Sequence, residues 1–307
     1  MSGTLFLLLG QYGSAPPVPR LVDAAVFGGG STSTFVAVTD IYTYSTNVDI
    51  AGTNLLLARW ALGATGNTVV GIFGGGNSGA TYYNNTDQYN YSANTVAGGA
   101  NLVISSAYRG ACGNATLGIF GGSGSSPIVA TTDQYMYSGN SVVPGTNLGT
   151  ARYGIGAAGN SILGAFRGGR PTASSVTTIS DIYSYSTSTV TSGTVMKTAR
   201  SYMGACGTSA YGIFGGGSPA SGVTAITEQY TYATDTAVVG TALKKSRTEL
   251  AAAGNQTVGI FGSGTVAPVT TYTDIYTYSS SSTVAGTVLK VARALLAAAS
   301  GNPGWSS

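Results

Sequence analysis

The chain has 307 residues, and its 47 glycines and 20 tyrosines contrast with a charged share of only 7% and no histidine. The formal net charge of +3, with Lys244 and Lys245 as the only adjacent basic residues, excludes the basic stripe of a nucleic-acid-binding protein. A hydrophobic share of 43% excludes a disordered chain, and no apolar run approaches the roughly 18 residues that a membrane-spanning helix needs.

The first 21 residues differ most from the rest of the chain. Residues 5–9 form an apolar run, and three prolines follow within residues 16–19. No Lys or Arg precedes Arg20, so this segment lacks the basic region that begins a secretory signal. We therefore expect residues 1–21 to form an arm that docks onto a partner subunit by strand addition. A cleaved leader is the alternative.

Residues 22–307 contain six copies of one repeat. Each copy has a Phe followed by a glycine-rich step, and successive Phe residues are 46, 47, 46, 48 and 47 positions apart. Each copy then has an acidic residue followed by a Tyr-x-Tyr pair, and the acidic residues are Asp40, Asp87, Asp133, Asp181, Glu228 and Asp274. Most copies end with an arginine, namely Arg59, Arg152, Arg200, Arg247 and Arg293, whereas the second copy has Ser106 there.

Each copy predicts four short β-strands. The first is rich in Ala and Gly, and a Gly-Asn pair such as Gly66-Asn67 follows it, where both residues tolerate the positive φ of a two-residue hairpin turn. The second strand ends at the glycines. The third carries the Tyr-x-Tyr pair, whose rings share one face and should pack on a neighbouring blade.

The two ends of the repeat region predict how the fold closes. The chain enters the repeat with a second strand at residues 22–27 and leaves it with a first strand at residues 294–300. Pairing of these two strands would complete the first blade and leave no open sheet edge. We predict an all-β, six-bladed β-propeller over residues 22–307, with four antiparallel strands per blade and the C-terminal strand closing the ring.

The order of these features resembles the kelch repeat, whose length is about 50 residues. The resemblance covers residues 22–300, but the Trp that is usual in the outer kelch strand is missing. Chains of this Gly-, Ser-, Thr- and Tyr-rich kelch-like type are similar to tail and surface proteins encoded by bacteriophages and environmental bacteria.

The repeated arginine and acidic residue allow two interpretations. They could form an ion pair within each blade, or the carboxylate could cap loop N–H groups, which would make both purely structural. Alternatively, the arginines could form a ring that is open to an anionic ligand. Cys112 and Cys206 occupy one repeat position in copies two blades apart, so we expect buried, unpaired thiols.

The sequence predicts no catalytic, metal or cofactor site. Without histidine, a Ser-His-Asp or Cys-His nucleophile and an imidazole metal site are excluded, as is the His- and Tyr-ligated copper of kelch-type oxidases. A propeller sialidase would need three clustered arginines, a tyrosine nucleophile and acidic partners, but each repeat arginine is matched by a carboxylate. The four other acidic residues are scattered, at Asp23, Asp49, Asp235 and Glu249.

Loop residues that depart from the repeat are the candidate ligand-binding residues. They are Tyr82, Tyr83, Asn84 and Asn85 in one loop, Arg167 and Arg170 in another, and Tyr272 in a third. Aromatic rings beside amide and guanidinium groups suit a sugar, which stacks on a ring and hydrogen-bonds through its hydroxyls. The alternative is that these residues pack locally or contact a neighbouring subunit.

These observations lead to three hypotheses for function. The first is a non-enzymatic, virion-associated structural or adhesion protein, such as part of a phage tail fibre or a capsid decoration. It would contact other virion subunits through residues 1–21 and bind a host glycan or receptor. The second is a secreted or surface-exposed bacterial carbohydrate-binding propeller. The third, which the residues support least, is a glycan-active enzyme that depends on Arg167 or Arg170.

Overall fold

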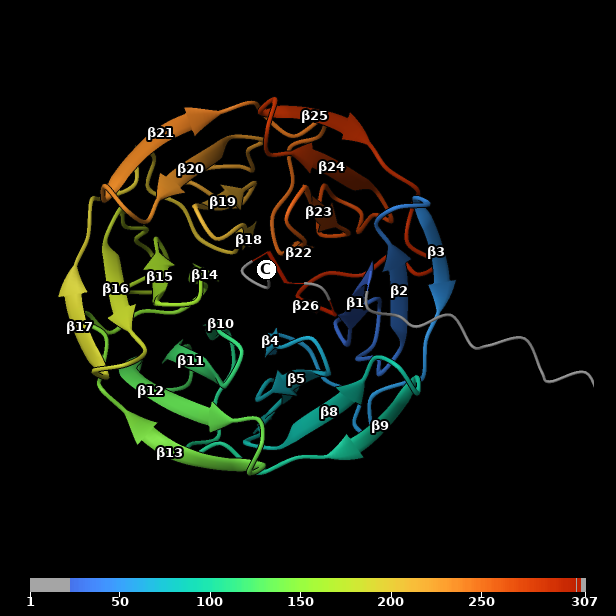
Figure 1. The fold of residues 1–307 in the computed structure, drawn as a ribbon, viewed down its shortest axis with the longest axis horizontal. Helices are drawn as coiled ribbons and strands as arrows, with labels where there is room; N and C mark the ends of the chain where they lie inside the picture. The colour runs from blue at the N-terminus through green and yellow to red at the C-terminus, as the bar shows by residue number, and fades with distance from the viewer. Residues whose placement is uncertain (1–22, 302, 305–307) are drawn as a thin grey trace, which may run out of the picture.

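A computed structural model describes residues 23–301, 303 and 304. Six four-stranded antiparallel sheets surround a central axis as the blades of a propeller (Figure 1). The predicted all-β, six-bladed architecture is therefore confirmed. The described part of the chain contains no helix that could span a membrane. The expected arm, residues 1–21, lies outside the described residues.

All six blades have the same strand order from the axis outward. Blade 1 contains β26 (Ala297–Ser300), β1 (Ala24–Gly28), β2 (Thr39–Thr43) and β3 (Val48–Ala51). Blade 2 contains β4 (Gly63–Gly66), β5 (Val70–Gly74), β8 (Thr86–Asn90) and β9 (Thr95–Gly98). Blade 3 contains β10 (Gly110–Gly113), β11 (Leu117–Ser123), β12 (Val129–Met136) and β13 (Ser141–Gly145).

The other three blades repeat this order. Blade 4 contains β14 (Gly156–Gly159), β15 (Leu163–Arg167), β16 (Ser180–Ser184) and β17 (Thr189–Ser192). Blade 5 contains β18 (Gly204–Gly207), β19 (Tyr211–Gly215), β20 (Thr227–Thr231) and β21 (Thr236–Gly240). Blade 6 contains β22 (Ala251–Gly254), β23 (Val258–Gly262), β24 (Thr273–Thr277) and β25 (Ser282–Ala285). A short hairpin, β6 (Asn77–Ser78) and β7 (Thr81–Tyr82), extends the loop of blade 2.

The ring closes in blade 1, as predicted. The C-terminal strand β26 pairs antiparallel with β1, with Ala25 opposite Ser300 and Gly28 opposite Ala297. Figure 1 shows β26, at the red end of the chain, as the innermost strand beside the blue β1. The two ends of the repeat region therefore hold each other, and no blade is left incomplete.

The core lies between the blades. Tyr89 and Tyr91 of blade 2 are fully buried in one cluster with Ala24, Val26 and Ile41 of blade 1. The same contact recurs between the other blades, for example Tyr183 and Tyr185 of blade 4 against Ile119 of blade 3. Both rings of each Tyr-x-Tyr pair thus pack on a neighbouring blade, as predicted.

Two faces of the propeller follow from the strand order. The turns between the first and second strands and between the third and fourth strands end one face, which we call the turn face. The longer loops between the second and third strands, and the linkers from each outer strand to the next inner strand, end the other face, which we call the loop face. The repeat arginines lie in these linkers. The loop face therefore carries both the longer loops and the arginine-bearing linkers of the repeat.

Candidate functional site

Each blade contains one buried ion pair between the linker arginine and the acidic residue of the third strand. The pairs are Arg59–Asp87, Arg109–Asp133, Arg152–Asp181, Arg200–Glu228, Arg247–Asp274 and Arg293–Asp40. The arginine side chains are at most 1% exposed. The structural interpretation is therefore confirmed, and the alternative of an arginine ring open to a ligand is wrong.

Each pair connects three segments of its blade. Arg59 donates to the Asp87 carboxylate at 2.9 Å and to the carbonyl of Phe73, at the end of the second strand, at 3.0 Å. The carboxylates also accept linker N–H groups, as Asp274 does from Lys244 at 2.9 Å. Burial lowers the pKa of Arg59 and raises the pKa of Asp87, while their mutual attraction opposes both shifts. Removal of either partner would leave a buried, unpaired charge.

Blade 3 forms its ion pair from a different sequence position. Ser106 occupies the place of the repeat arginine, and the guanidinium comes from Arg109, three residues later. The equivalent of Arg109 in other blades is apolar, as at Leu62 and Ile155, and those residues surround the axis. Arg109 reaches outward from the axis to Asp133 and to the carbonyl of Phe120 at 2.8 Å. Ser106 does occupy the position of the repeat arginine, as the sequence indicates, and Arg109 supplies the guanidinium in its place.

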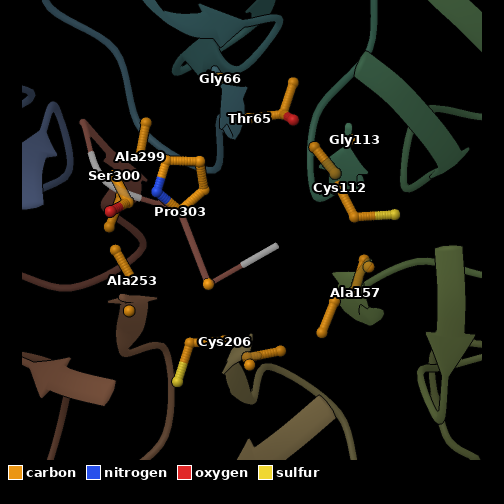
Figure 2. A pocket seen from close by; sticks show the side chains of 18 residues that line it. Thr65, Gly66, Cys112, Gly113, Ala157, Cys206, Ala253, Ala299, Ser300 and Pro303 are labelled. Carbon is orange, nitrogen blue, oxygen red and sulfur yellow. The ribbon is translucent and has the colours of Figure 1, made fainter. Parts of the chain in front are cut away.

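In the described part of the chain, the axial channel contains only small cavities, of about 90, 70 and 110 Å³. At the turn face its mouth encloses about 90 Å³ and is lined by small residues of the inner strands, together with Pro303 (Figure 2). Small-molecule sites usually enclose about 300–1,000 Å³. Cys112 and Cys206 line this mouth as free, buried thiols, as predicted, and burial raises the pKa of each to about 12.

A ring of backbone hydrogen bonds narrows the channel at the loop face. One residue per blade, two positions after the repeat arginine or after Ser106 in blade 3, has a left-handed backbone with φ of 54–61°; these residues are Ala61, Tyr108, Gly154, Tyr202, Glu249 and Leu295. Each donates its N–H to its counterpart in the preceding blade, for example Tyr108 to Ala61 at 2.8 Å, and Ala61 closes the ring on Leu295 at 2.7 Å. A left-handed backbone costs a residue other than glycine about 1–3 kcal/mol, so the ring must hold it in place.

Around this ring, aromatic side chains from several blades form a continuous cluster, which we call the aromatic cluster. Ring centroids are 5.8 Å apart for Phe35 and Trp60, 6.0 Å for Trp60 and Tyr108, 5.9 Å for Tyr108 and Tyr153, and 6.2 Å for Tyr153 and Tyr202. All five side chains are partly exposed. Burial, with smaller contributions from Tyr82 and Glu249, raises the pKa of Tyr108 to about 12. The Tyr108 hydroxyl is therefore neutral at physiological pH.

One side of the aromatic cluster forms an open hollow of about 440 Å³ across blades 3 to 5. Its lining consists of Tyr108, Gly124, Ser125, Ser126, Ile128, Tyr153, Ala173 and Tyr202, which include no carboxylate. The guanidinium of Arg170 lies at its border, 6.0 Å from the ring centroid of Tyr202, and donates to the carbonyl of Ala173 at 2.7 Å. A second hollow of about 340 Å³ lies on the turn face, but its one aromatic residue, Tyr185, is buried in the core.

The predicted residues of blade 2 lie beside the aromatic cluster but outside the hollow. Tyr82 is 36% exposed and lies close enough to Tyr108 to contribute to the raised pKa of that residue. The hydroxyl of Tyr83 hydrogen-bonds that of Ser78 at 2.8 Å, and the Asn84 amide donates to the carbonyl of Leu102 at 3.1 Å, so both are engaged locally. Asn85 is exposed.

Two further predicted residues are separated from this site. Arg167 is the last residue of β15 and fully buried, so its prediction as an exposed loop residue is wrong. Its guanidinium lies 5.2 Å from the centroid of the Phe214 ring and 4.6 Å from that of the Tyr230 ring. The position of Arg167 is occupied by a glycine in the other blades. Tyr272, in blade 6, is 43% exposed, and the Lys245 ammonium lies 3.5 Å from the centroid of its ring. A hydrogen bond from this ammonium and its charge lower the pKa of Tyr272.

Sequence reasoning missed most of the site. Trp60 and Tyr153 directly follow a repeat arginine, and Tyr108 and Tyr202 follow that position by two residues. The equivalent positions elsewhere hold small or unrelated residues such as Thr248 and Leu295, so the departure from the repeat was visible. The proximity of these aromatic residues was not visible, because it depends on the ring of left-handed residues at the axis.

Comparison with known proteins finds no protein-family model and no curated protein that matches the sequence. The resemblance to the kelch repeat therefore stays a prediction from spacing and residue order. No group of three or more Cys, Asp or Glu residues that could hold a metal ion occurs in the described part of the chain. The chemistry that the hollow and its border offer is stacking, hydroxyl hydrogen bonding and one guanidinium.

Proposed function

We propose that this protein is a non-enzymatic binding module that recognises a glycan in the hollow beside Tyr108, Tyr153 and Tyr202. The observation that carries the proposal is the aromatic cluster, because partly exposed tyrosines meet there beside an open hollow. Elsewhere in the repeat the tyrosines of the Tyr-x-Tyr pairs are buried between blades. At the loop face, by contrast, Tyr108 and Tyr202 pack on a small buried cluster that includes Ala61 and still keep part of each ring exposed.

The lining of the hollow fits the chemistry of a sugar. The apolar C–H face of a pyranose stacks on an aromatic ring, and the tyrosines offer such rings with little conformational entropy to lose. Ser125 and Ser126 add hydroxyls that both donate and accept hydrogen bonds, as sugar hydroxyls do. General acid–base hydrolysis of a glycoside uses two carboxyl groups, which the lining of the hollow does not provide. These features support binding without turnover.

The setting that we propose for this activity is a virion, where the propeller would be a tail or capsid-decoration subunit used for adhesion. The outer strands support it, because they carry exposed Val, Ser and Thr residues and little charge, which suits a surface outside the cell. A secreted or surface-exposed bacterial carbohydrate-binding propeller is the alternative setting. Both settings use the same loop face, and mass spectrometry of purified particles distinguishes them by the presence or absence of the chain.

The test of glycan binding is a glycan array probed with the full chain, followed by titration calorimetry on the best ligand. Tyr153→Ala should weaken binding about 10- to 100-fold, as expected for removal of a stacked aromatic residue at the centre of a binding site. The melting temperature should change little, because Tyr153 is partly exposed.

Tyr272→Ala is the matched control, because Tyr272 is an exposed loop-face tyrosine of blade 6 that lies outside the hollow. It should leave affinity within about twofold of wild type. Equal losses in both variants, or no binding to any glycan, would contradict the proposed function.

A further inference from the structure

The charges of this protein are distributed unevenly between its two faces. Six arginines and six carboxylates are buried in the repeat ion pairs and are unavailable to a ligand. The cations that remain at least partly exposed among the described residues are Arg170, Lys197, Lys244, Lys245 and Lys290. All five lie in loops or linkers of the loop face.

The remaining carboxylates do not balance these cations. Asp23 and Asp235 lie at turns, where they accept the backbone N–H groups of Ser45 and Thr194. Asp49 is buried in β3, and its carboxylate accepts the N–H of Lys290 at 3.0 Å. Glu249 is the one carboxylate of the described chain in the ring at the loop-face mouth. The five cations therefore outnumber the three carboxylates that lie at the loop face or bond its linkers, namely Asp49, Asp235 and Glu249.

Arg170 is placed differently from the other arginines. It is partly exposed and forms no ion pair with a described residue, whereas six described arginines are paired and Arg167, which is also unpaired, is fully buried. A guanidinium has five N–H donors, and only the bond to Ala173 is made to the described residues. The side chain is only partly exposed, and Tyr202 and the backbone bridge to Tyr153 help to position it at the border of the hollow.

We propose that the ligand is an acidic glycan, with a sugar ring stacked in the hollow and its carboxylate or sulfate on the guanidinium of Arg170. This inference rests on the proposed function and adds the chemical class of the ligand. A guanidinium matches the planar, two-oxygen geometry of a carboxylate better than an ammonium does. Arg170 is thus the anion-binding group of the site, and Tyr153 and Tyr202 are its stacking surface.

The lysines act at longer range. Lys197, Lys244, Lys245 and Lys290 lie in the linkers that enter blades 5, 6 and 1, and none of them lines the hollow. Exposed charges that do not contact the ligand are screened by salt, so they should speed the approach of a polyanion without fixing its position. Affinity for the acidic glycan should therefore fall as ionic strength rises.

The experiment measures binding of the full chain to matched acidic and neutral polymers by biolayer interferometry. The pairs are polygalacturonate and its methyl ester, sialylated and desialylated N-acetyllactosamine, and dextran sulfate and dextran. We expect at least one acidic member to bind at least tenfold more tightly than its neutral counterpart. Binding of dextran sulfate alone would identify a sulfate ester, rather than a carboxylate, as the acidic group.

Three variants connect this preference to Arg170. Arg170→Gln should abolish the preference for the acidic member, and Arg170→Lys should restore it in part because charge returns without the planar fork. Lys290→Gln removes the same unit of charge from the loop face outside the hollow and should change affinity less than twofold. Melting temperatures of all three should match wild type.

The outcomes separate the two proposals. If glycans bind with no acidic preference and Tyr153→Ala abolishes that binding, the acidic class is wrong and the proposed function stands. If Arg170→Gln keeps the full acidic preference, or Lys290→Gln abolishes it equally, Arg170 is not the anion-binding group. If no polymer binds to the wild type, the proposed function itself fails.

Discussion

The interior of the blades and the loop face of blades 3 to 5 use arginine and tyrosine for different purposes. In the interior six arginines are each paired with a carboxylate, Arg167 packs on the rings of Phe214 and Tyr230, and each Tyr-x-Tyr pair packs on the neighbouring blade. On the loop face, Arg170 has no ion-pair partner among the described residues, and Tyr108, Tyr153 and Tyr202 meet at an open hollow. In a repeat protein, a residue present in every copy serves the fold, whereas a departure at the surface is a candidate for function.

The largest expected effect tests whether Arg109 belongs to the interior. Arg109→Leu should lower the free energy of unfolding by about 3–5 kcal/mol, because Asp133 would keep a buried charge without its partner. Adding Ser106→Arg to the same chain should recover most of the loss, since it rebuilds the pattern of the other blades. Urea denaturation measures both changes.

Arg170→Leu serves as the loop-face control for this pair of variants. A partly exposed arginine without an ion pair should change the free energy of unfolding by no more than about 0.5 kcal/mol. A loss as large as that of Arg109→Leu would show that the two regions do not differ as described. Failure of Ser106→Arg to rescue the stability would show that the blade 3 ion pair depends on more than the guanidinium.

A smaller effect comes from an interior position where blade 1 departs from the repeat. Asp49 is buried opposite Tyr42, where other blades have residues such as Val96 and Val142. Burial, followed by the nearby Asp40 carboxylate, raises the pKa of Asp49 from 3.8 to about 7. Because the folded state holds this proton more tightly than the unfolded chain, stability should fall as the pH rises from about 4 through 7 and then level off.

Asp49→Asn should remove this part of the pH dependence. At pH 8 it should raise the free energy of unfolding by about 2 kcal/mol. This is roughly half of the free energy that corresponds to the pKa shift of Asp49, because solvent screens the charge in part. Chemical denaturation at pH 4.5, 6, 7 and 8 checks the slope. A variant with the same pH profile as wild type would mean that Asp49 is ionised in the folded protein without cost.

The smallest effect concerns the second tyrosine of each Tyr-x-Tyr pair. Tyr137 hydrogen-bonds Thr65 at 3.0 Å, and Tyr185 donates to the sulfur of Cys112 at 3.6 Å, each on the preceding blade. The corresponding neighbour of Tyr232 is Ala158, and the buried Tyr232 hydroxyl has no partner among the described residues. Ala158→Thr should supply one and raise the free energy of unfolding by about 1 kcal/mol.

Ala158→Val is the matched control, because it has the shape of threonine without the hydroxyl. It should give no gain, and both variants can be compared by their urea midpoints. Equal stabilisation by Val and Thr would mean that filled space, and not the hydrogen bond, is what this position lacks.

The sequence was sufficient to predict the architecture because the same short-range features recur six times. Glycine steps, Gly-Asn turns and Tyr-x-Tyr pairs specify strands and faces, and the incomplete copies at the two ends specify the closure through β1 and β26. Arg109 was missed because a guanidinium can reach Asp133 from the axis as well as from the linker. The spacing of a repeat does not show which route a long side chain takes.

The candidate site was harder to predict for a related reason. Arg167 and Arg170 are three residues apart, yet one is buried against Phe214 and the other borders the hollow. The proximity of Tyr108 and Tyr202, from blades 3 and 5, depends on the hydrogen-bonded ring of left-handed residues, which has no signal in residue type. Departures from the repeat pointed to the loop face, and the distances on that face required the structure.

The most direct test of the central claim is a crystal structure of the protein with the tightest-binding glycan of the panel. The account predicts a sugar ring stacked on Tyr153 or Tyr202 in the hollow of blades 3 to 5, with its acidic group on Arg170. A ligand bound in the axial channel, on the turn face or on blade 6 beside Tyr272 would contradict it.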